Sequence, residues 1–283
     1  PNAMVQVSPV TKFHSGAGYQ YEDSVIYGFT HTNKGHWNLC HIPLLPVTGT
    51  PTPGDYCSPF SHERESAAPG YYQVFLDRYG VDAQLSSTLR CAFHKYTYPA
   101  GAAASLLADL QRSNEHVRAW DIRKEGDNVF AGWQQTGEKM YFYAVANRPV
   151  TGIEPVVEGD REVRIVRFGE GDGALELRIG FSFVSEKNAR ENLEAEMLGK
   201  SFAEVRSEAT ATWNDLLGRI RVEGGTEREK GLFYSSLYRS FLWPALRSDV
   251  NGEFTDVDGK VINPGFRYYT GPSYWDDYRN KLI

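Results

Sequence analysis

The chain has 283 residues, of which 41% are hydrophobic and 13% aromatic, and its 30 basic and 36 acidic side chains give a formal net charge of −6. This composition supports one or two well-packed domains and excludes extended disorder. Because lysines and arginines are interspersed with acids along the whole length, the sequence argues against nucleic acid as a partner.

No stretch approaches the roughly 18 uninterrupted apolar residues that a membrane-spanning helix requires. The first residues, PNAMVQVSP, have no basic region leading into an apolar one, so no signal peptide is expected within this chain. Three cysteines, Cys40, Cys57 and Cys91, are too few and too irregularly spaced for a zinc site, and at most one disulfide can form among them. We expect all three to act as small hydrophobic residues.

Short apolar runs separated by turn residues dominate the first 185 positions. Many alternate apolar with polar residues and are rich in β-branched and aromatic side chains, which is typical of half-buried strands. Turn segments such as EGDN (125–128), TGEK (136–139) and GEGDG (169–173) join them without amphipathic helices between, so the pattern predicts an antiparallel β-sandwich. The predicted strands lie within 4–10, 24–32, 71–76, 81–88, 90–98, 127–135, 139–150 and 174–185.

Helical spacing replaces this alternation after Ser185. Ser185 and Gly199 are placed to begin and end a first helix. A second helix is predicted over 201–218, with Gly218 as its end. The residues expected to be buried are Ala189, Leu193 and Met197 in the first helix, and Phe202, Val205, Ala209, Trp213 and Leu216 in the second.

Thr226 and Glu229 form a capping box for a third helix, which Pro244 terminates. Its apolar residues cover much of the circumference, so we expect this helix to be buried between other helices. Turn chemistry returns over 248–269 and predicts a hairpin. The DVDG segment (256–259) favours a hairpin turn over a calcium loop, because calcium prefers six to eight oxygen ligands.

Several motifs occur in one order along the chain. They are YGFTHTNKGH (27–36), SPFSHERESAAPGYYQVFL (58–76), LRCAFHKYTYP (89–99), the long helical run 185–225, FYSSLYRSFLWP (233–244) and YWDDYR (274–279). Together they resemble the amino-terminal half of glycoside hydrolase family 92, the calcium-dependent exo-acting α-mannosidases. The resemblance spans essentially the whole chain.

The resemblance implies a β-sandwich over 1–185, a helical linker over 186–225 and the first helices of an (α/α)6 barrel over 226–283. It also implies the amino-terminal part of an inverting enzyme that removes terminal α-mannose from mannose-containing glycans and is secreted, periplasmic or exposed at the cell surface. Inverting glycosidases use two carboxyl groups roughly 6.5–9.5 Å apart. In the family these two groups and the main calcium ligands lie in the barrel beyond residue 283, so no catalytic or metal residue is assigned here and the fragment itself is expected to be inactive.

The segment 271–283 reads as the start of another helix and carries the best candidates for substrate binding: Trp275, Asp276, Asp277 and Arg279. A carboxylate accepts hydrogen bonds from adjacent sugar hydroxyls, and an indole packs on the apolar face of a sugar ring. In the family, the aspartate directly after this tryptophan points into the mannose pocket, which corresponds to Asp276. The structural alternative is a first helical turn in which Asp276 and Asp277 complement the helix dipole and Arg279 pairs with either.

A loop before the GFTHT strand supplies a tryptophan over the pocket in the family. The corresponding loop here, residues 11–21, contains no tryptophan, so Phe13 or His14 would have to replace it. The alternative is that both are ordinary loop residues.

Two further groups are expected to be structural. Glu63 and Glu65 should form hydrogen bonds within a loop of the sandwich. The irregular loop that holds His31, His36 and His41 fixes no metal geometry.

The chain departs from the family pattern near the candidate sugar site, with Pro272, Tyr274 and Asp277 at positions where other residues are common. Two alternative functions therefore stay open. One is the same architecture acting on a mannose phosphodiester or another α-linked sugar. The other is a non-enzymatic sugar-binding or scaffolding sandwich.

Overall fold

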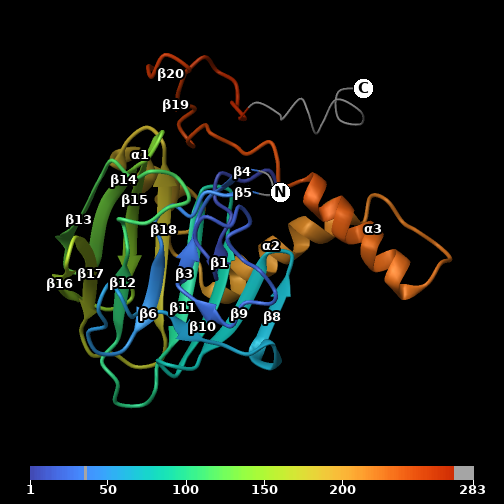
Figure 1. Ribbon diagram of the computed structural model, residues 1–283. Coiled ribbons are helices and arrows are strands. Elements are labelled where there is room, and N and C mark those ends of the chain that lie inside the picture. The colour runs from blue at the N-terminus through green and yellow to red at the C-terminus, as the bar shows by residue number, and fades with distance from the viewer. Residues whose placement is uncertain (35–36, 271–283) are drawn as a thin grey trace.

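Two antiparallel sheets packed face to face make up the first two thirds of the molecule (Figure 1). The structure, a computed structural model, describes residues 1–34 and 37–270. One sheet has six strands. Their order across the sheet is β1 (Ser8–Val10), β3 (Gly28–Thr30), β6 (Leu44–Val47), β12 (Ser105–Ala108), β17 (Arg161–Phe168) and β16 (Val150–Glu158).

The second sheet has eight strands. Their order is β13 (Ala119–Gly126), β14 (Val129–Gln135), β15 (Lys139–Ala146), β18 (Leu175–Ser182), β11 (Cys91–Thr97), β10 (Val81–Ser87), β9 (Tyr71–Leu76) and β8 (Glu65–Ala68). Shorter elements complete the sandwich: β2 (Val25–Ile26) pairs with β7 (Ser58–Pro59), β4 (Asn33–Lys34) pairs with β5 (Trp37–Asn38), and a 3-10 turn covers His62–Arg64. The predicted antiparallel sandwich is confirmed.

Alternation along the strands explains where the core forms. In β15 every second residue, from Met140 to Ala146, is buried, as expected for a strand with one face in a sandwich core. The strand β11 is different, because Ala92 and Tyr96 pack into the core between the sheets while Cys91 and Phe93 pack into a second cluster on the outer face. The eight-stranded sheet is therefore covered on both sides along this strand.

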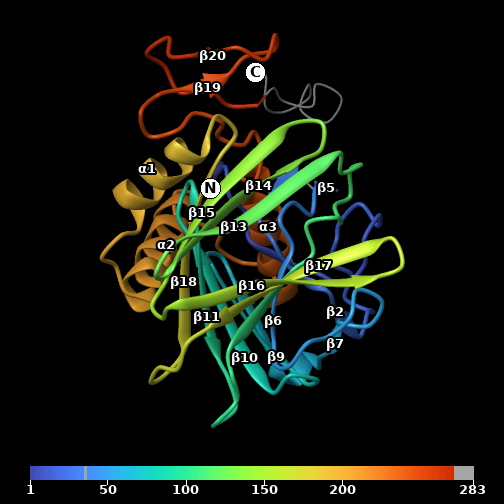
Figure 2. The same ribbon diagram turned by 90° about the vertical axis from the view of Figure 1, so that its left-hand side faces the viewer.

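Helices α1 (Glu186–Glu196) and α2 (Phe202–Leu217) supply that outer cover (Figure 2). Ser185 caps the first helix by accepting a hydrogen bond from the backbone of Asn188, and Ser201 forms a capping box with Glu204. Both helices lie where the sequence predicted them. Their buried face against the sheet is formed by Leu193, Met197, Phe202 and Val205.

Helix α3 (Glu227–Ser240) has the predicted capping box of Thr226 and Glu229 but not the predicted burial. None of its residues is buried, and Leu232 is 60% exposed. Its Tyr238 ring packs on Trp213 of α2 with ring centroids 4.6 Å apart, while the helix as a whole projects away from the sandwich (Figure 1). The expectation of a buried helix is wrong for this part of the chain, because the described residues supply a neighbour on one side of the helix.

The chain then returns to the end of the sandwich. The short strands β19 (Phe254–Thr255) and β20 (Val261–Ile262) form the predicted hairpin, and the backbone of Asp256 pairs with Lys260 across its turn. Thr255 donates from Oγ1 to the carbonyl of Phe183 over 3.2 Å, which ties the hairpin to the sandwich. All three cysteines are free, and Cys40 and Cys91 are buried among apolar residues as expected.

Candidate functional site

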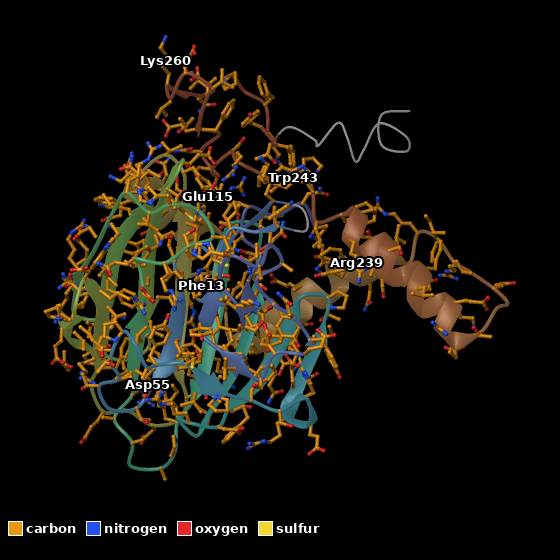
Figure 3. All side chains as sticks on the ribbon, in the orientation of Figure 1. Phe13, Asp55, Glu115, Arg239, Trp243 and Lys260 are labelled. Atoms are coloured by element: carbon orange, nitrogen blue, oxygen red, sulfur yellow. The ribbon has the colours of Figure 1, made fainter. Side chains whose placement is uncertain are left out.

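A crevice of about 340 Å³ lies between the end of the sandwich and residues 243–270. This volume is within the range of small-molecule binding pockets. Figure 3 shows Glu115 and Trp243 at this end of the sandwich, below the hairpin that carries Lys260, whereas Asp55 lies at the opposite end. The polar and aromatic residues of the lining are Lys34, Glu115, Glu138, Phe183, Trp243, Arg247, Thr255, Asp256, Tyr268 and Thr270.

Backbone pairing holds the crevice wall that follows α3. The amide of Arg247 donates to the carbonyl of Tyr268 over 2.9 Å. The amide of Thr270 donates to the carbonyl of Ala245 over 2.9 Å, and the amide of Ala245 donates to the side-chain Oγ1 of Thr270 over 3.1 Å. Leu246 donates to the carbonyl of Asn2 over 2.9 Å, so this wall is also fixed to the first residues of the chain. Arg247 and Thr270 consequently line the crevice from adjacent extended segments.

Glu115 lies in the loop between β12 and β13 and is held by two buried side chains. Its Oε2 atom accepts a hydrogen bond from Thr136 Oγ1 over 2.6 Å and lies 3.1 Å from His41 Nε2. The hydrogen bond from His41 lowers the pKa of Glu115 to about 2, with a smaller contribution from Thr136, although partial burial acts in the opposite direction. Glu115 is therefore ionised under all physiological conditions.

The hydrogen-bonding pattern places a proton on one nitrogen of His41. An ionised carboxylate only accepts, so the proton between His41 and Glu115 must be on Nε2 of the ring. Nδ1 lies 2.8 Å from the hydroxyl oxygen of Thr32. His41 is 2% exposed in its side chain, so its ring is a fixed, buried donor beneath Glu115.

Arg247 is the more deeply buried of the two basic residues that line the crevice, Lys34 being the other. It pairs with Glu138 over 3.0 Å, and its guanidinium carbon lies 3.7 Å from the ring centroid of Phe183. Its side chain is only 14% exposed, and Nε is buried with no hydrogen-bond partner among the described residues. Burial lowers the pKa of Arg247, while Glu138, Tyr268 and Glu115 favour its charged form. The guanidinium thus retains a donor that no described residue uses.

A larger crevice of about 410 Å³ lies between the first residues of the chain, β8–β10 and α2. Its lining includes Ala67, Val205, Trp213 and Tyr238, so it is mainly an apolar junction between sandwich and helices. It brings together no pair of opposite charges comparable to Glu115 and Arg247, and the smaller crevice is the better candidate for a ligand site.

The residues predicted to bind substrate are not all described. Trp275, Asp276, Asp277 and Arg279 lie outside the described residues, which end at Thr270 in the wall of the crevice.

The two loop candidates are placed by the structure. Phe13 is buried against Val10, Cys40 and Tyr27, so it faces the core and is unavailable to stack on a ligand. His14 is exposed, with a left-handed backbone (φ +59°), and its amide donates to Asn114 Oδ1.

The predicted structural residues have clear partners. His31 Nε2 lies 3.2 Å from His94 Nε2 in the sandwich core, and His41 holds Glu115 as described above, while His36 lies outside the described residues. Glu65 accepts hydrogen bonds from Tyr19 and Tyr72, which confirms its predicted structural role. For Glu63 the structure shows a backbone N–H donating to Ser61 Oγ.

The sequence singled out neither Glu115 nor Arg247. Glu115 follows the turn residues Ser113 and Asn114, and its partner His41 lies 74 positions away. Turn residues in the sequence can predict that such a carboxylate lies in a loop, but no local sequence pattern indicates the buried histidine that holds it.

No three His, Cys, Asp or Glu side chains gather as a potential metal site within residues 1–34 and 37–270. Asp249 and Glu253, two acids near the crevice, accept hydrogen bonds from the Asn188 amide, so their oxygens are engaged by donors rather than left for calcium. The residues that the structure describes therefore provide no calcium site, and the resemblance places the main calcium ligands beyond residue 283. None of the described helices is long and apolar enough to cross a membrane.

An antiparallel sandwich followed by helices, with a polar crevice between one end of the sandwich and residues 243–270, defines an all-β domain joined to a helical segment. The chain matches the glycosyl hydrolase family 92 N-terminal domain over residues 1–193 and the glycosyl hydrolase family 92 catalytic domain over residues 188–283. It belongs to glycosyl hydrolase family 92 (GH92).

Solved structures of the family share the fold. A GH92 α-mannosidase from Bacteroides thetaiotaomicron is 27% identical with a TM-score of 0.91, and the match covers 99% of this chain and 43% of the enzyme. The same enzyme has been solved with mannoimidazole, and that match has a TM-score of 0.90 and covers 99% of this chain and 42% of the enzyme. Another GH92 glycosyl hydrolase is 28% identical with a TM-score of 0.87, over 99% of this chain and 43% of that protein.

A curated relative, an uncharacterized secreted glycosidase from Arthroderma benhamiae, is 24% identical over 87% of this chain and 38% of its own length. The chain thus spans about two fifths of the length of the relatives it matches.

Proposed function

We propose that this chain is the amino-terminal part of an inverting, calcium-dependent exo-α-mannosidase that removes terminal α-mannose from glycans. The observation that supports this most strongly is the likeness to the α-mannosidase from Bacteroides thetaiotaomicron, which extends over 99% of the chain and across both domain models. That enzyme binds mannoimidazole. From the family resemblance we further propose that the chain leads into an (α/α)6 barrel that holds the catalytic acid, the catalytic base and the calcium ligands.

Within this proposal the crevice is the contribution of the sandwich to the substrate site. Its lining combines an ionised carboxylate, a guanidinium and aromatic rings, which together suit the hydroxyls and apolar face of a sugar. Thr270 lies in the wall of the crevice. Residues 271–283, which follow it in the sequence, include Asp276, the proposed mannose ligand. Secretion is proposed from the secreted fungal relative.

The proposal is tested with the enzyme that carries this chain together with a complete GH92 catalytic domain. We expect release of mannose from α-mannobiose, loss of activity after dialysis against a calcium chelator, and recovery when calcium is restored. Proton NMR of the first product should show β-mannose, because an inverting enzyme turns an α-linkage into a β-hemiacetal. First formation of α-mannose would contradict the inverting mechanism. If the enzyme hydrolyses a mannose phosphodiester or another α-linked sugar but not α-mannobiose, that compound is the substrate in place of an α-mannoside. Sugar binding without any hydrolysis would indicate a sugar-binding sandwich.

A further inference from the structure

Glu115 differs from its two anchors in how much of it reaches solvent. Its side chain is 41% exposed in the crevice, whereas the His41 side chain and Thr136 are buried. Two buried side chains that hold one accessible carboxylate fix the direction in which that carboxylate points. The two residues that fix the carboxylate lie inside the sandwich, and the carboxylate itself reaches the crevice outside it.

Only one of the two carboxylate oxygens is used by these anchors. Both His41 and Thr136 form hydrogen bonds to Glu115 Oε2. Each oxygen of an ionised carboxylate can accept two hydrogen bonds. Glu115 Oε1 therefore retains acceptor capacity toward the crevice that the residue lines.

Arg247 offers the complementary group within the same crevice. Its Nε is a buried donor that no described residue satisfies, and a buried donor without a partner is costly. The crevice thus presents a fixed acceptor beside the positive charge of Arg247, while Nε itself is closed off from solvent. A hydroxyl group suits this pair, because it donates to the carboxylate and can turn its oxygen lone pairs toward the cation.

The charges around the crevice discriminate among ligand classes. Glu115, Glu138 and Asp256 outnumber Lys34 and Arg247 in the lining and would repel a phosphate. A neutral polyol meets no such obstacle. Tyr268 in the same lining, half-buried with its ring stacked on Phe254, adds aromatic surface for the apolar face of a sugar ring.

We infer that Glu115 is a sugar-binding residue whose carboxylate, fixed by His41 and Thr136, accepts hydrogen bonds from hydroxyls of a neutral hexose unit held in the crevice beside Arg247. The inference rests on the proposed function in that the hexose is a unit of the mannose-containing glycan. It assigns Glu115 to binding and Thr136 to positioning.

The substitution Glu115→Gln separates binding from structure. The amide oxygen of glutamine still accepts from His41 and Thr136, while its NH2 group turns the crevice-facing acceptor into a donor. We expect the KM for α-mannobiose to rise at least tenfold with kcat within threefold, since an interaction of this kind serves ground state and transition state alike. The Tm should stay within 2 °C. The matched control is Glu154→Gln, because Glu154 is an exposed carboxylate paired with Arg167 far from the crevice.

Thr136 gives an independent test of positioning. Thr136→Val removes the hydroxyl that donates to Glu115 and should raise KM several-fold, whereas Thr136→Ser restores that hydroxyl and should return KM to within twofold of the wild-type value. A purely structural role would lower Tm in step with activity and would leave KM unchanged in the folded enzyme.

The proposed function and the inference about Glu115 can be contradicted separately. If the wild-type enzyme hydrolyses α-mannobiose and Glu115→Gln changes neither KM nor kcat by more than twofold, the inference is overturned while the proposed function stands. If the wild-type enzyme hydrolyses no α-mannoside, the proposed function fails, and calorimetric titration with methyl α-mannoside, methyl α-glucoside and methyl α-galactoside decides the inference. Binding that Glu115→Gln abolishes would support it, and equal or absent binding would overturn it.

Discussion

Asn192 in α1 donates from Nδ2 to Asp249 Oδ1 over 2.6 Å, so the first helix is tied directly to the segment that carries Arg247. Asp249 is buried and also accepts from Ser182 over 2.6 Å and from Asn188 over 2.9 Å. One carboxylate therefore joins the end of β18, helix α1 and the wall of the crevice.

Replacing this carboxylate should destabilise the protein without touching the crevice lining. Asp249→Ala leaves three buried donors without their acceptor, and we expect a loss of about 3 kcal/mol in the free energy of unfolding. Urea titration measures this loss. Asp258→Ala, in the exposed hairpin turn, is the control and should change stability by less than about 0.5 kcal/mol. A loss below about 1 kcal/mol at Asp249 would show that water replaces the missing oxygens.

Gly180 in β18 allows α1 to lie close to the sheet. A Cβ atom at this position would lie 2.1 Å from the carbonyl oxygen of Ala189 and 2.8 Å from Leu193 Cβ. Gly180→Ala should therefore push the helix away and destabilise the protein by about 2–3 kcal/mol. Gly152→Ala, where a Cβ meets no atom within 4 Å, is the matched control. Equal urea midpoints for the two variants would disprove the close packing.

The buried pair of His31 and His94 should make stability depend on pH in the mildly acidic range. Burial lowers the pKa of His31 to about 3 and lowers the pKa of His94 still more clearly, where the proximity of His31 adds to the effect. In the unfolded chain both titrate near 6.5. Between these limits the unfolded state binds more protons, so the free energy of unfolding falls as pH drops from about 6.5 toward 3.

Urea titrations at pH 7, 6 and 5 test this dependence. The double variant His31→Asn with His94→Asn should be less stable at pH 7 but should lose less stability between pH 7 and 5 than the wild-type chain. Parallel losses in both proteins would assign the acid sensitivity to other groups.

Asp276 is expected to bind mannose in the full-length enzyme, as the family resemblance implies. Asp276→Ala should reduce kcat/KM at least a hundredfold without unfolding the protein, because sugar hydroxyls desolvated without an acceptor cost about 2–4 kcal/mol. Asp277, the next residue in the sequence, should not share this target. If Asp277→Ala abolishes activity and Asp276→Ala keeps kcat/KM within threefold of wild type, the assignment is wrong although the family membership stands.

Residues 1–283 by themselves should release no mannose, because the proposed catalytic acid and base lie outside them. Incubation of the purified chain with 4-nitrophenyl α-mannoside and calcium, followed by absorbance at high enzyme concentration, checks this expectation. The complete enzyme serves as the positive control. Turnover by the chain alone would mean that a catalytic pair lies within these residues.

The sequence predicted the helices well because their boundaries depend on local chemistry. Ser185, Ser201 and Thr226 each accept a hydrogen bond from a backbone amide within the next three residues, and such contacts leave a local signature. Strand β16 was not singled out, since Pro155 and flanking glutamates interrupt its alternation; as an edge strand it tolerates a missing donor.

The crevice could not be predicted in the same way. Its main residues come from separate loops, and the orientation of Glu115 depends on His41 at a distance of 74 positions and on Thr136 from the β14–β15 turn. The burial of α3 was overestimated for a related reason. Apolar residues around a helix show that it has partners, but they do not show whether those partners belong to the same stretch of chain.

The helices that cover the outer face of the eight-stranded sheet are synthesised after strand β11, which they cover. Phe93 packs edge-on against Phe202 with ring centroids 5.3 Å apart, although the two residues are 109 positions apart in the chain. A ribosome adds roughly 5–20 residues per second and delivers the amino-terminal part first, so Phe93 waits on the order of 5–20 s before its partner exists. During that interval the finished strands present an apolar outer face, which is the kind of surface that chaperones bind and that promotes aggregation. The smallest unit that buries this face ends with α2 rather than with the last strand of the sandwich.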